Sequence, residues 1–246
     1  MRFKKKVVLV TGASKGLGRS TAILFAKEGA DVVVNYYKSE KQAEEVVSEI
    51  KNMGRKSIKV KADVSIENEV KEMINQVITV FEKIDVLVNN AGVIFEMPLK
   101  NRTMEFWDKT LNVNLKGTFI CSKLVSFFMR KAKSGNIINV ASVNPIYKNN
   151  PEVIDYDVSK AGVIALTHDF SKELAPYVRV NAVAPGWIET DMNKELSSNY
   201  KKREIDKIYL RRFAAPEEIA NVILFIASRE ASFVNNSIIK VDGGYN

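Results

Sequence analysis

Short apolar runs alternate with charged, helix-like stretches along nearly the whole chain of 246 residues. A run of four to eight apolar residues suits a strand that is covered on both faces, whereas the longer stretches carry apolar residues at helical spacing. Strands that are separated by helices pair in parallel, with helices on both sides of the sheet. We therefore predict strands at 7–10, 31–37, 57–64, 84–90, 136–142, 178–185 and 237–244, and helices near 17–28, 39–53, 66–82, 104–131, 155–175 and 216–228.

The seven predicted strands fit one domain. Apolar residues make up 46% of the chain and charged residues 27%, which is ordinary for a globular protein. A chain of this length can bury a sizeable core without disulfides or metals, and neither a linker nor a low-complexity tract interrupts it. We predict an α/β fold over residues 1–246, with a doubly wound, seven-stranded parallel sheet and a less regular polar stretch at 187–212.

The rarest residues exclude several kinds of site. Cys121 is the one cysteine, so no disulfide forms within the chain, which fits a reducing compartment. His168 is the one histidine, so a histidine metal cluster or a Ser/His/Asp triad is excluded, and we predict a surface helix position for it. The apolar run at 7–10 is too short for a signal peptide or a membrane span. We expect a cytoplasmic protein with no metal and no membrane partner.

The net charge of +8 raises the question of nucleic acid. The lysines are spread along the chain and interleaved with acidic residues, as in KSEKQAEEVVSEIKNMGRK, which is typical of solvated helix faces. We therefore predict no nucleic-acid partner. The excess charge still favours anionic ligands such as phosphates.

A glycine-rich turn joins the first predicted strand to the first helix. Glycines let the backbone turn tightly and approach a pyrophosphate, and the helix that follows offers free amide groups. The spacing G-x-x-x-G-x-G differs from the common G-x-G-x-x-G, and a turn that merely connects strand to helix is the alternative. The candidate cofactor-binding residues of this turn are Gly12, Ser14, Lys15, Gly16, Leu17 and Gly18.

The end of the second strand bears on the choice of nucleotide. An NAD site usually places a carboxylate there to accept hydrogen bonds from the ribose. Here Asn35 and Tyr36 occupy this position, Asp31 lies at the strand's start, and Lys15 in the glycine turn could reach a 2′-phosphate. We predict NADP(H) as the preferred cofactor, with NAD(H) as the alternative.

Tyr156 and Lys160 are four residues apart, so they share one face of the predicted helix at 155–175. If that face lines a cleft, the ammonium should lower the pKa of the phenol from its ordinary value of about 10 and make it a better acid–base group. Taken alone, the spacing also occurs by chance, and the alternative is a half-exposed tyrosine beside a solvated lysine. The rest of the chain decides between the two.

Several short motifs occur together and in order along the whole chain. They are TGASKGLG at 11–18, Asp63-Val64, NNAG at 89–92, Asn114 in NVNLKG, Ser142 in NVASV, Tyr156 with Lys160, PGWIETDM at 185–192 and VDGG at 241–244. In this combination the chain resembles the short-chain dehydrogenase/reductase family, which implies a Rossmann fold and hydride transfer between a nicotinamide and a carbonyl or alcohol. The joint occurrence is far more specific than any single motif.

The resemblance assigns roles to four catalytic candidates, each with a physical basis. Tyr156 would give a proton to the carbonyl oxygen or take it back, and Lys160 would stabilise the phenolate and hold the nicotinamide ribose. Ser142 would donate a hydrogen bond to the substrate oxygen. Asn114 would hold a water that links Lys160 to solvent, or would simply satisfy a kinked helix. The further cofactor-binding candidates that the resemblance implies are Asp63, Val64, Asn90, Ala91, Gly92, Pro185, Gly186, Ile188 and Thr190.

The substrate is less constrained than the reaction. PGWIETDM resembles 3-oxoacyl-(acyl-carrier-protein) reductases, while NYYKSEKQAEEVVSEIK and PEEIANVILFIASREASF are similar to glucose 1-dehydrogenases. The first similarity predicts a carbonyl substrate on an acyl thioester, and the second a sugar or polyol. A basic patch for an acidic carrier protein, or else solvated surface charge, is expected at Arg130, Lys131, Lys133 and Lys172.

Three departures from the family pattern suggest a modified pocket entrance. They are Tyr209 and Arg211 in IYLRRF, the bulky loop NPIYKNNPEVID after Ser142, and the basic residues Lys194, Lys201, Lys202 and Arg203 in the expected substrate lid at 187–212. The resemblance also implies a homotetramer that forms through the helices at 104–131 and 155–175 and through C-terminal segments. Cys121 and Phe127-Phe128 would then lie in an interface or in the core. A regulator that binds NADP(H) without catalysis is the alternative from another class of protein.

Overall fold

A computed structural model describes residues 1–148, 150–190 and 196–245 of the chain. Its strands are β1 (Val7–Val10), β2 (Asp31–Tyr36), β3 (Ser57–Lys61), β4 (Val86–Asn89), β5 (Gly135–Val140), β6 (Val178–Pro185) and β7 (Ile238–Val241). Its α-helices are α1 (Gly16–Lys27), α2 (Glu40–Asn52), α3 (Glu67–Phe81), α4 (Met104–Leu111), α5 (Gly117–Lys131), α6 (Ile154–Leu174), α7 (Ser198–Asp206) and α8 (Pro216–Ala227).

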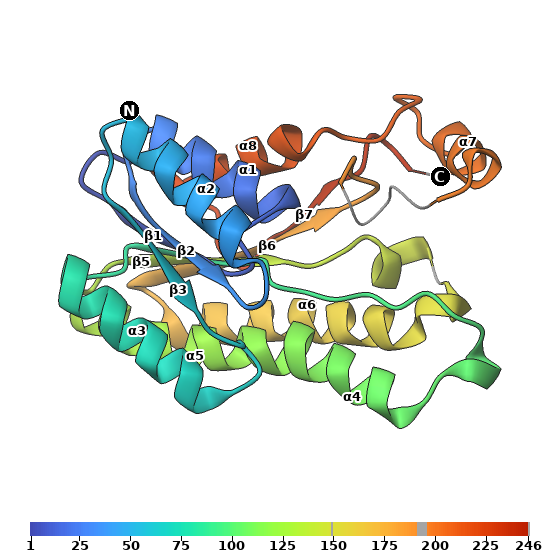
Figure 1. Cartoon of the computed structure of the whole chain (residues 1–246), viewed down its shortest axis with the longest axis horizontal. Coiled ribbons are helices and arrows are strands. Elements are labelled where there is room, and N and C mark those ends of the chain that lie inside the picture. The colour runs from blue at the N-terminus through green and yellow to red at the C-terminus, as the bar shows by residue number, and fades with distance from the viewer. Residues whose placement is uncertain (149, 191–195, 246) are drawn as a thin grey trace.

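The seven strands form one sheet in the order β3-β2-β1-β4-β5-β6-β7, and every pair of neighbours is parallel. The strand order reverses direction between β1 and β4. Figure 1 shows α1, α2 and α8 above the sheet, and α3, α5 and α6 below it. The predicted fold class, a doubly wound parallel sheet with helices on both faces, is confirmed.

The core lies on the two faces of this sheet. Val8, Val10 and Val32 pack upward with Phe25 of α1 and Ile223 of α8. The alternate residues pack downward with α3 and α5, as Leu9, Val33, Leu87, Met73 and Val125 show. Both faces of each central strand are buried, which explains why the strands read as continuous apolar runs. Cys121 belongs to the lower core and is fully buried.

Two regions differ in detail from the sequence-based expectation. The single helix predicted at 104–131 is interrupted by a π-helical turn, η2 (Asn112–Lys116), between α4 and α5. The stretch at 187–212, expected to be less regular, contains α7, which begins at a Ser197 side chain that accepts from the backbone N–H of Tyr200. Lys194 of that stretch lies outside the described residues. Within the described ranges, we find no helix long and apolar enough to cross a bilayer.

Candidate active site

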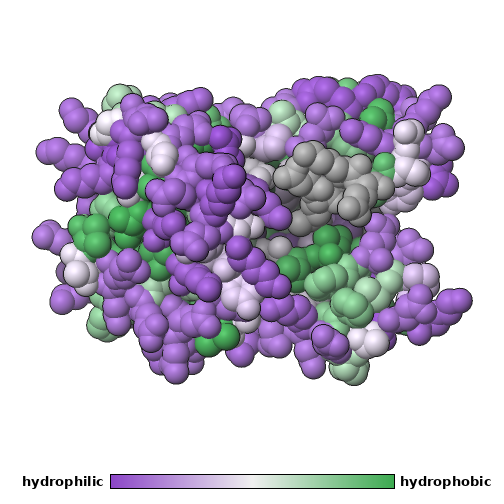
Figure 2. Space-filling view, viewed as in Figure 1, coloured by the Kyte–Doolittle hydropathy of each residue, from purple (hydrophilic) through white to green (hydrophobic). Residues whose placement is uncertain are grey.

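The predicted site residues gather at the carboxyl ends of the strands. The glycine turn follows β1, Asn90–Gly92 follow β4, Ser142 follows β5, and Gly186 follows β6. In open parallel sheets, ligands bind at this edge, in the crevice where the strand order reverses. Figure 2 shows mostly hydrophilic side chains on the face viewed, with a smaller hydrophobic area just below the grey residues in its right half.

Close approach of backbone segments fixes the shape of the glycine turn. Gly12 has φ = +61°, a left-handed conformation that favours glycine. A Cβ on Gly18 would lie 2.5 Å from Nδ2 of Asn90 and closer still to the carbonyl oxygen of Gly12. That Asn90 amide donates to the carbonyl oxygens of Thr11 and Gly12, at 2.9 and 3.1 Å. The turn therefore presents a bare backbone at the start of α1, a cradle that fits the pyrophosphate of a dinucleotide.

The end of β2 supports this turn from the side. Asn35 is buried, and its side chain accepts from the N–H of Gly12 at 3.1 Å and donates to the carbonyl oxygen of Ala62 at 3.2 Å. Tyr36 is buried as well, and burial raises the pKa of its phenol. Lys15 is exposed on the turn. Asn35 thus shapes the cradle from inside the protein, and Lys15 presents an exposed cation beside it.

Asp63 lies beyond the end of β3, where the adenine end of a nucleotide is expected. Burial raises the pKa of its carboxyl group, but hydrogen bonds from Ser65 and the Lys109 ammonium outweigh this effect and lower the pKa overall. The Lys109 ammonium lies 3.5 Å from the Asp63 carboxylate and 5.6 Å from the centre of the Tyr37 ring. Val64, the other predicted residue here, packs against α5 so closely that a Cβ on Gly117 would lie 2.7 Å from it.

Asn114 lies in the π-helical turn and is fully buried. Its Oδ1 accepts from the N–H of Val93 at 2.8 Å, and its Nδ2 donates to the carbonyl oxygen of Val93 and to Oγ of Ser159. A Cβ on Gly92 would lie 3.3 Å from Oδ1 of Asn114 and 3.8 Å from Nζ of Lys160. Both amide donors of Asn114 therefore have protein partners, as the kinked-helix interpretation requires, and the water relay stays a prediction.

Lys160 is 5% exposed, which is exceptional for a lysine. Its ammonium donates to the carbonyl oxygen of Val140 at 2.6 Å and lies 5.6 Å from the centre of the Tyr156 ring. Burial lowers the pKa of this ammonium to about 8. The lysine is thus held against the end of β5, under the tyrosine, and its ammonium is more acidic than that of an exposed lysine.

Tyr156 is half-buried on the first turns of α6, with the Ser142 hydroxyl near its phenol. Burial raises the pKa of its phenol to about 12, which the Ser142 hydrogen bond opposes and the Asp157 carboxylate reinforces. The sequence predicted that Lys160 would lower this pKa. The prediction is wrong, because the combined effect of the surrounding protein groups is to raise it. The physical reason is desolvation, which disfavours the phenolate, while the ammonium is directed to Val140. At neutral pH, Tyr156 carries its proton.

The loop that follows β6 lies over the glycine turn. A Cβ on Gly16 would lie 3.5 Å from Cγ2 of Thr190. Pro185 ends β6 and accepts from the N–H of Val143, while Gly186 donates to the carbonyl oxygen of Val241. Ile188 bridges to Ala214. The described part of this loop thus contacts the neighbour of Ser142 at Pro185 and the glycine turn at Thr190.

Sequence reasoning missed the side-chain pairs that hold this half of the site. Arg102 and Asp155 form an ion pair at 2.8 Å, with side chains only 4% and 0% exposed, directly before Tyr156. Asp157 accepts from Asn144, two residues after Ser142. Glu204 on α7 accepts from Trp187 and Tyr245. Two acidic residues in the first turn of α6 were a usable signal, because carboxylates are favoured at helix N-termini.

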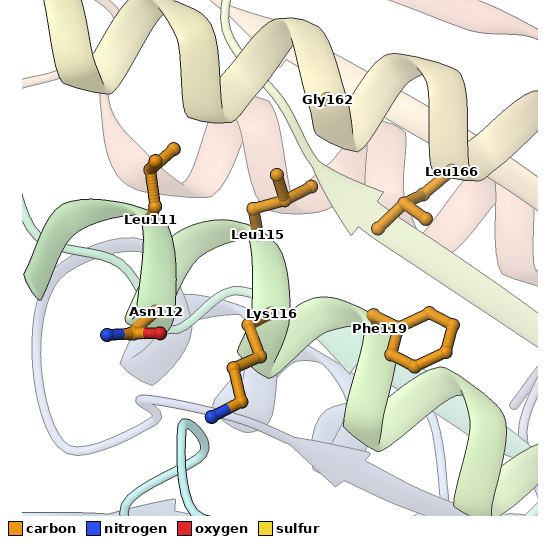
Figure 3. A pocket seen from close by; sticks show the side chains of 7 residues that line it. All are labelled: Leu111, Asn112, Leu115, Lys116, Phe119, Gly162 and Leu166. Atoms are coloured by element: carbon orange, nitrogen blue, oxygen red, sulfur yellow. The ribbon is translucent and has the colours of Figure 1, made fainter. Parts of the chain in front are cut away.

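A shallow apolar groove of about 470 Å³ is lined by residues other than the predicted site residues (Figure 3). It runs between the α4–η2–α5 segment and α6, and it is lined by Leu111, Asn112, Leu115, Lys116, Phe119, Gly162 and Leu166. The side chain of Phe119 is 42% exposed. Within the described residues, no group of three or more histidine, cysteine, aspartate or glutamate side chains could hold a metal ion.

Comparison with protein families and curated proteins places this chain among known enzymes. The family described as enoyl-(acyl carrier protein) reductase matches residues 12–246. The 3-oxoacyl-[acyl-carrier-protein] reductase FabG of Thermotoga maritima is 43% identical over 245 residues, which are 99% of each chain. The enzyme of the same name from Staphylococcus epidermidis is 44% identical over 240 residues, with 97% of this chain and 98% of that one covered.

Solved structures match over the same length. A short-chain dehydrogenase from Burkholderia cenocepacia, crystallised in complex with NADP, aligns with a TM-score of 0.93 at 30% identity, covering 99% of both chains. A protein described as a gluconate dehydrogenase of Agrobacterium tumefaciens aligns with a TM-score of 0.94 at 30% identity, covering 98% of this chain and 96% of that one.

Proposed function

The chain belongs to the short-chain dehydrogenase/reductase family, and on this premise we propose that it reduces the carbonyl group of a 3-oxoacyl thioester with NADPH. The observation that carries the proposal is the convergence of three side chains beside the glycine cradle. The Ser142 hydroxyl lies near enough to Tyr156 to lower the pKa of its phenol, and the Lys160 ammonium lies 5.6 Å from the centre of the tyrosine ring. The similarity to the two 3-oxoacyl reductases over nearly the full length supports the substrate class.

The cofactor supplies the hydride, and the protein supplies position and the proton. Tyr156 donates its proton to the carbonyl oxygen, and the Ser142 hydroxyl donates a hydrogen bond to the same oxygen as charge develops there. The raised pKa of Tyr156 keeps the phenol protonated at neutral pH, which is the form that reduction needs. Once the proton has left, the Lys160 ammonium stabilises the phenolate.

The nucleotide would lie along the strand ends from Asp63 to Ser142. The glycine turn would hold the pyrophosphate, Lys15 would bind a 2′-phosphate, and Asn90, Ala91 and Gly92 would line the path to the nicotinamide. The exposed lysine and the lack of a carboxylate at the end of β2 favour NADP(H). The relative that was crystallised with NADP supports this choice.

A substrate panel tests the proposal. NADPH oxidation is followed with a 3-oxoacyl thioester, and NADP⁺ reduction with aldohexoses and polyols, each repeated with the non-phosphorylated cofactor. We expect turnover of the thioester and a preference of at least about tenfold in kcat/KM for NADPH, since one charged contact gives a discrimination of this size. Turnover of a sugar alone would show that the substrate is a sugar and not a 3-oxoacyl thioester. Tight NADPH binding without any turnover would favour a regulator that binds NADP(H) without catalysis.

The carrier protein and the assembly are further parts of the proposal. Arg130 and Lys131 end α5, Lys133 follows it, and Lys172 lies near the end of α6. Arg130 pairs with Glu173 of α6, so these cations share one end of the molecule. The groove of Figure 3 presents apolar side chains of α5 and α6, the helices through which we expect tetramers to form. Phe119→Glu should reduce the mass measured by light scattering, and an unchanged mass would move the interface elsewhere.

A further inference from the structure

The carboxylate of Asp157 joins both ends of the loop that follows Ser142. Its Oδ1 accepts from Nδ2 of Asn144 at 2.9 Å, and its Oδ2 accepts from the backbone N–H of Asn150 at 3.1 Å. Asn144 begins the π-helical turn η3 (Asn144–Lys148), and Asn150 directly precedes the short helix η4 (Pro151–Val153), which leads into α6. One side chain on α6, next to Tyr156, therefore fixes where this loop leaves the sheet and where it returns.

The same contact reaches the Ser142 hydroxyl group. The backbone N–H of Asn144 donates to Oγ of Ser142 at 3.1 Å. A serine oxygen that accepts from a fixed backbone donor has its own hydrogen left to direct elsewhere. The Ser142 hydroxyl in turn acts on the Tyr156 phenol, whose pKa it lowers. The chain of contacts thus runs from Asp157 through Asn144 and Ser142 back to Tyr156, the neighbour of Asp157.

We propose that Asp157 and Asn144 are positioning residues, which orient the Ser142 hydroxyl toward Tyr156 and toward the substrate oxygen. The inference rests on the proposed carbonyl reduction. It concerns residues outside the Ser142, Tyr156, Lys160 and Asn114 set, and neither would touch the reacting atoms. Their effect comes from geometry, because a small displacement of a catalytic donor lowers the rate far more than it weakens binding.

The effect of Asp157 on Tyr156 can be distinguished from the effects of the other charged groups around the tyrosine. Lys160 lies under the ring, one turn along α6. Asp155 accepts from the N–H of Tyr156, and its charge is paired with Arg102. Asp157 is the acidic residue whose charge raises the pKa of the phenol. Removal of this charge should therefore make the phenol more acidic, an effect that loss of a merely structural contact would not produce.

The first test is steady-state kinetics of NADPH-dependent reduction by Asn144→Ala, Asp157→Asn and the double variant. Asp169→Asn is the matched control, because Asp169 is an exposed acid on the same helix. We expect each single variant to lower kcat about tenfold, with the Kd of NADPH within about twofold of wild type. The double variant should be no slower than the slower single variant, because both changes break one chain of contacts. A kcat within twofold of wild type in both single variants would overturn the proposal.

The second test needs no turnover. The protein is labelled with 3-fluorotyrosine, and the ¹⁹F resonance of residue 156 is identified by its loss in Tyr156→Phe. We expect this resonance to move in Asn144→Ala, and to titrate at lower pH in Asp157→Asn but not in Asp169→Asn. A resonance that coincides with wild type in both variants would contradict the proposal. Absence of wild-type turnover would instead count against the proposed function, and the two failures are thereby separated.

Discussion

The two sides of the active-site edge are built in different ways. On the nucleotide side, which comprises the turn at 11–18 and the segment 89–92, most of the side-chain hydrogen bonds join a side chain to a backbone group, as when Asn90 donates to the carbonyl oxygens of Thr11 and Gly12. The exception is Asn89, which donates to the side chains of Ser122 and Asn139. On the carbonyl side, which comprises 93–103, 142–148, 150–157, 187–190 and 196–213, pairs of side chains from distant segments hold the loops. Arg102 pairs with Asp155, and Trp187 donates to Glu204.

This difference suggests which side of the active-site edge tolerates amino-acid substitutions. A backbone cradle fits one shape of ligand and tolerates few substitutions, in keeping with the invariant chemistry of a dinucleotide. Side-chain pairs can be exchanged without a change of fold, so a pocket held by them can be altered for a new substrate. The three departures from the family pattern all fall on the carbonyl side.

The strongest test of the carbonyl side is the buried ion pair. Arg102→Met leaves the Asp155 carboxylate buried without its cation, and we expect the free energy of unfolding to fall by about 3–5 kcal/mol. Urea denaturation measures this loss. Asp155→Asn in the Arg102→Met background should restore part of it, because the neutral amide no longer needs a cation. A loss below about 1 kcal/mol would mean that the pair behaves as a surface contact.

The close packing on the nucleotide side is tested by adding one methyl group to the glycine turn. Gly18→Ala places a Cβ against Asn90 and Gly12, whereas at an open helix position the same change would stabilise the fold by about 1 kcal/mol. We expect the Kd of NADPH, measured by fluorescence titration, to rise about 100-fold from overpacking. Gly54→Ala is the control, because Gly54 has φ = +72° but nothing within 4 Å of the added atom. Equal Kd values of NADPH for the two variants would show that the glycine turn can accommodate the added methyl group.

Asp85 directly precedes β4, at the end of the strands opposite to the cofactor site. A change there should therefore affect the stability of the fold but not NADPH binding. Burial raises the pKa of Asp85, but hydrogen bonds from Lys6, Lys83 and the N–H of Val7 outweigh this effect and lower the pKa overall. A lowered pKa means that the carboxylate stabilises the fold at neutral pH and loses this effect as the pH falls below about 4.

We therefore expect Asp85→Asn to lose about 2 kcal/mol of unfolding free energy at pH 7, with the difference from wild type shrinking in acid. Thermal and urea unfolding between neutral and acidic pH measure it. NADPH binding should be unchanged. A constant difference at all pH values would assign the effect to packing instead of charge.

The smallest expected effect concerns the loop after Ser142. The Tyr147 hydroxyl donates to Asp242, and its ring stacks on Tyr245 in the C-terminal segment. Tyr147→Phe removes only the hydrogen bond, so we expect the KM for the carbonyl substrate to rise about threefold while NADPH affinity stays constant. Tyr177→Phe, at an exposed position, is the control. A change in NADPH affinity would mean that the two sides are not independent.

The extent of sequence-based prediction follows the same division. The strands and the glycine turn were predictable, because local periodicity and backbone geometry are encoded in neighbouring residues. Asp157 with Asn144, and Arg102 with Asp155, were not, because each pair joins segments that only the fold brings together. The pKa of Tyr156 was predicted in the wrong direction, since the four-residue spacing indicates the proximity of Lys160 but not the desolvation of the phenol by the rest of the fold.

The most direct test of the central claim is Tyr156→Phe, assayed in parallel for NADPH binding and for reduction of a 3-oxoacyl thioester. This variant removes the proton donor and keeps the ring that lies over Lys160. We expect the Kd of NADPH to stay within about twofold of wild type and kcat to fall by about 10²–10⁴, the range for loss of a general acid. Turnover that remains close to wild type would contradict the assignment of Tyr156 as the proton donor.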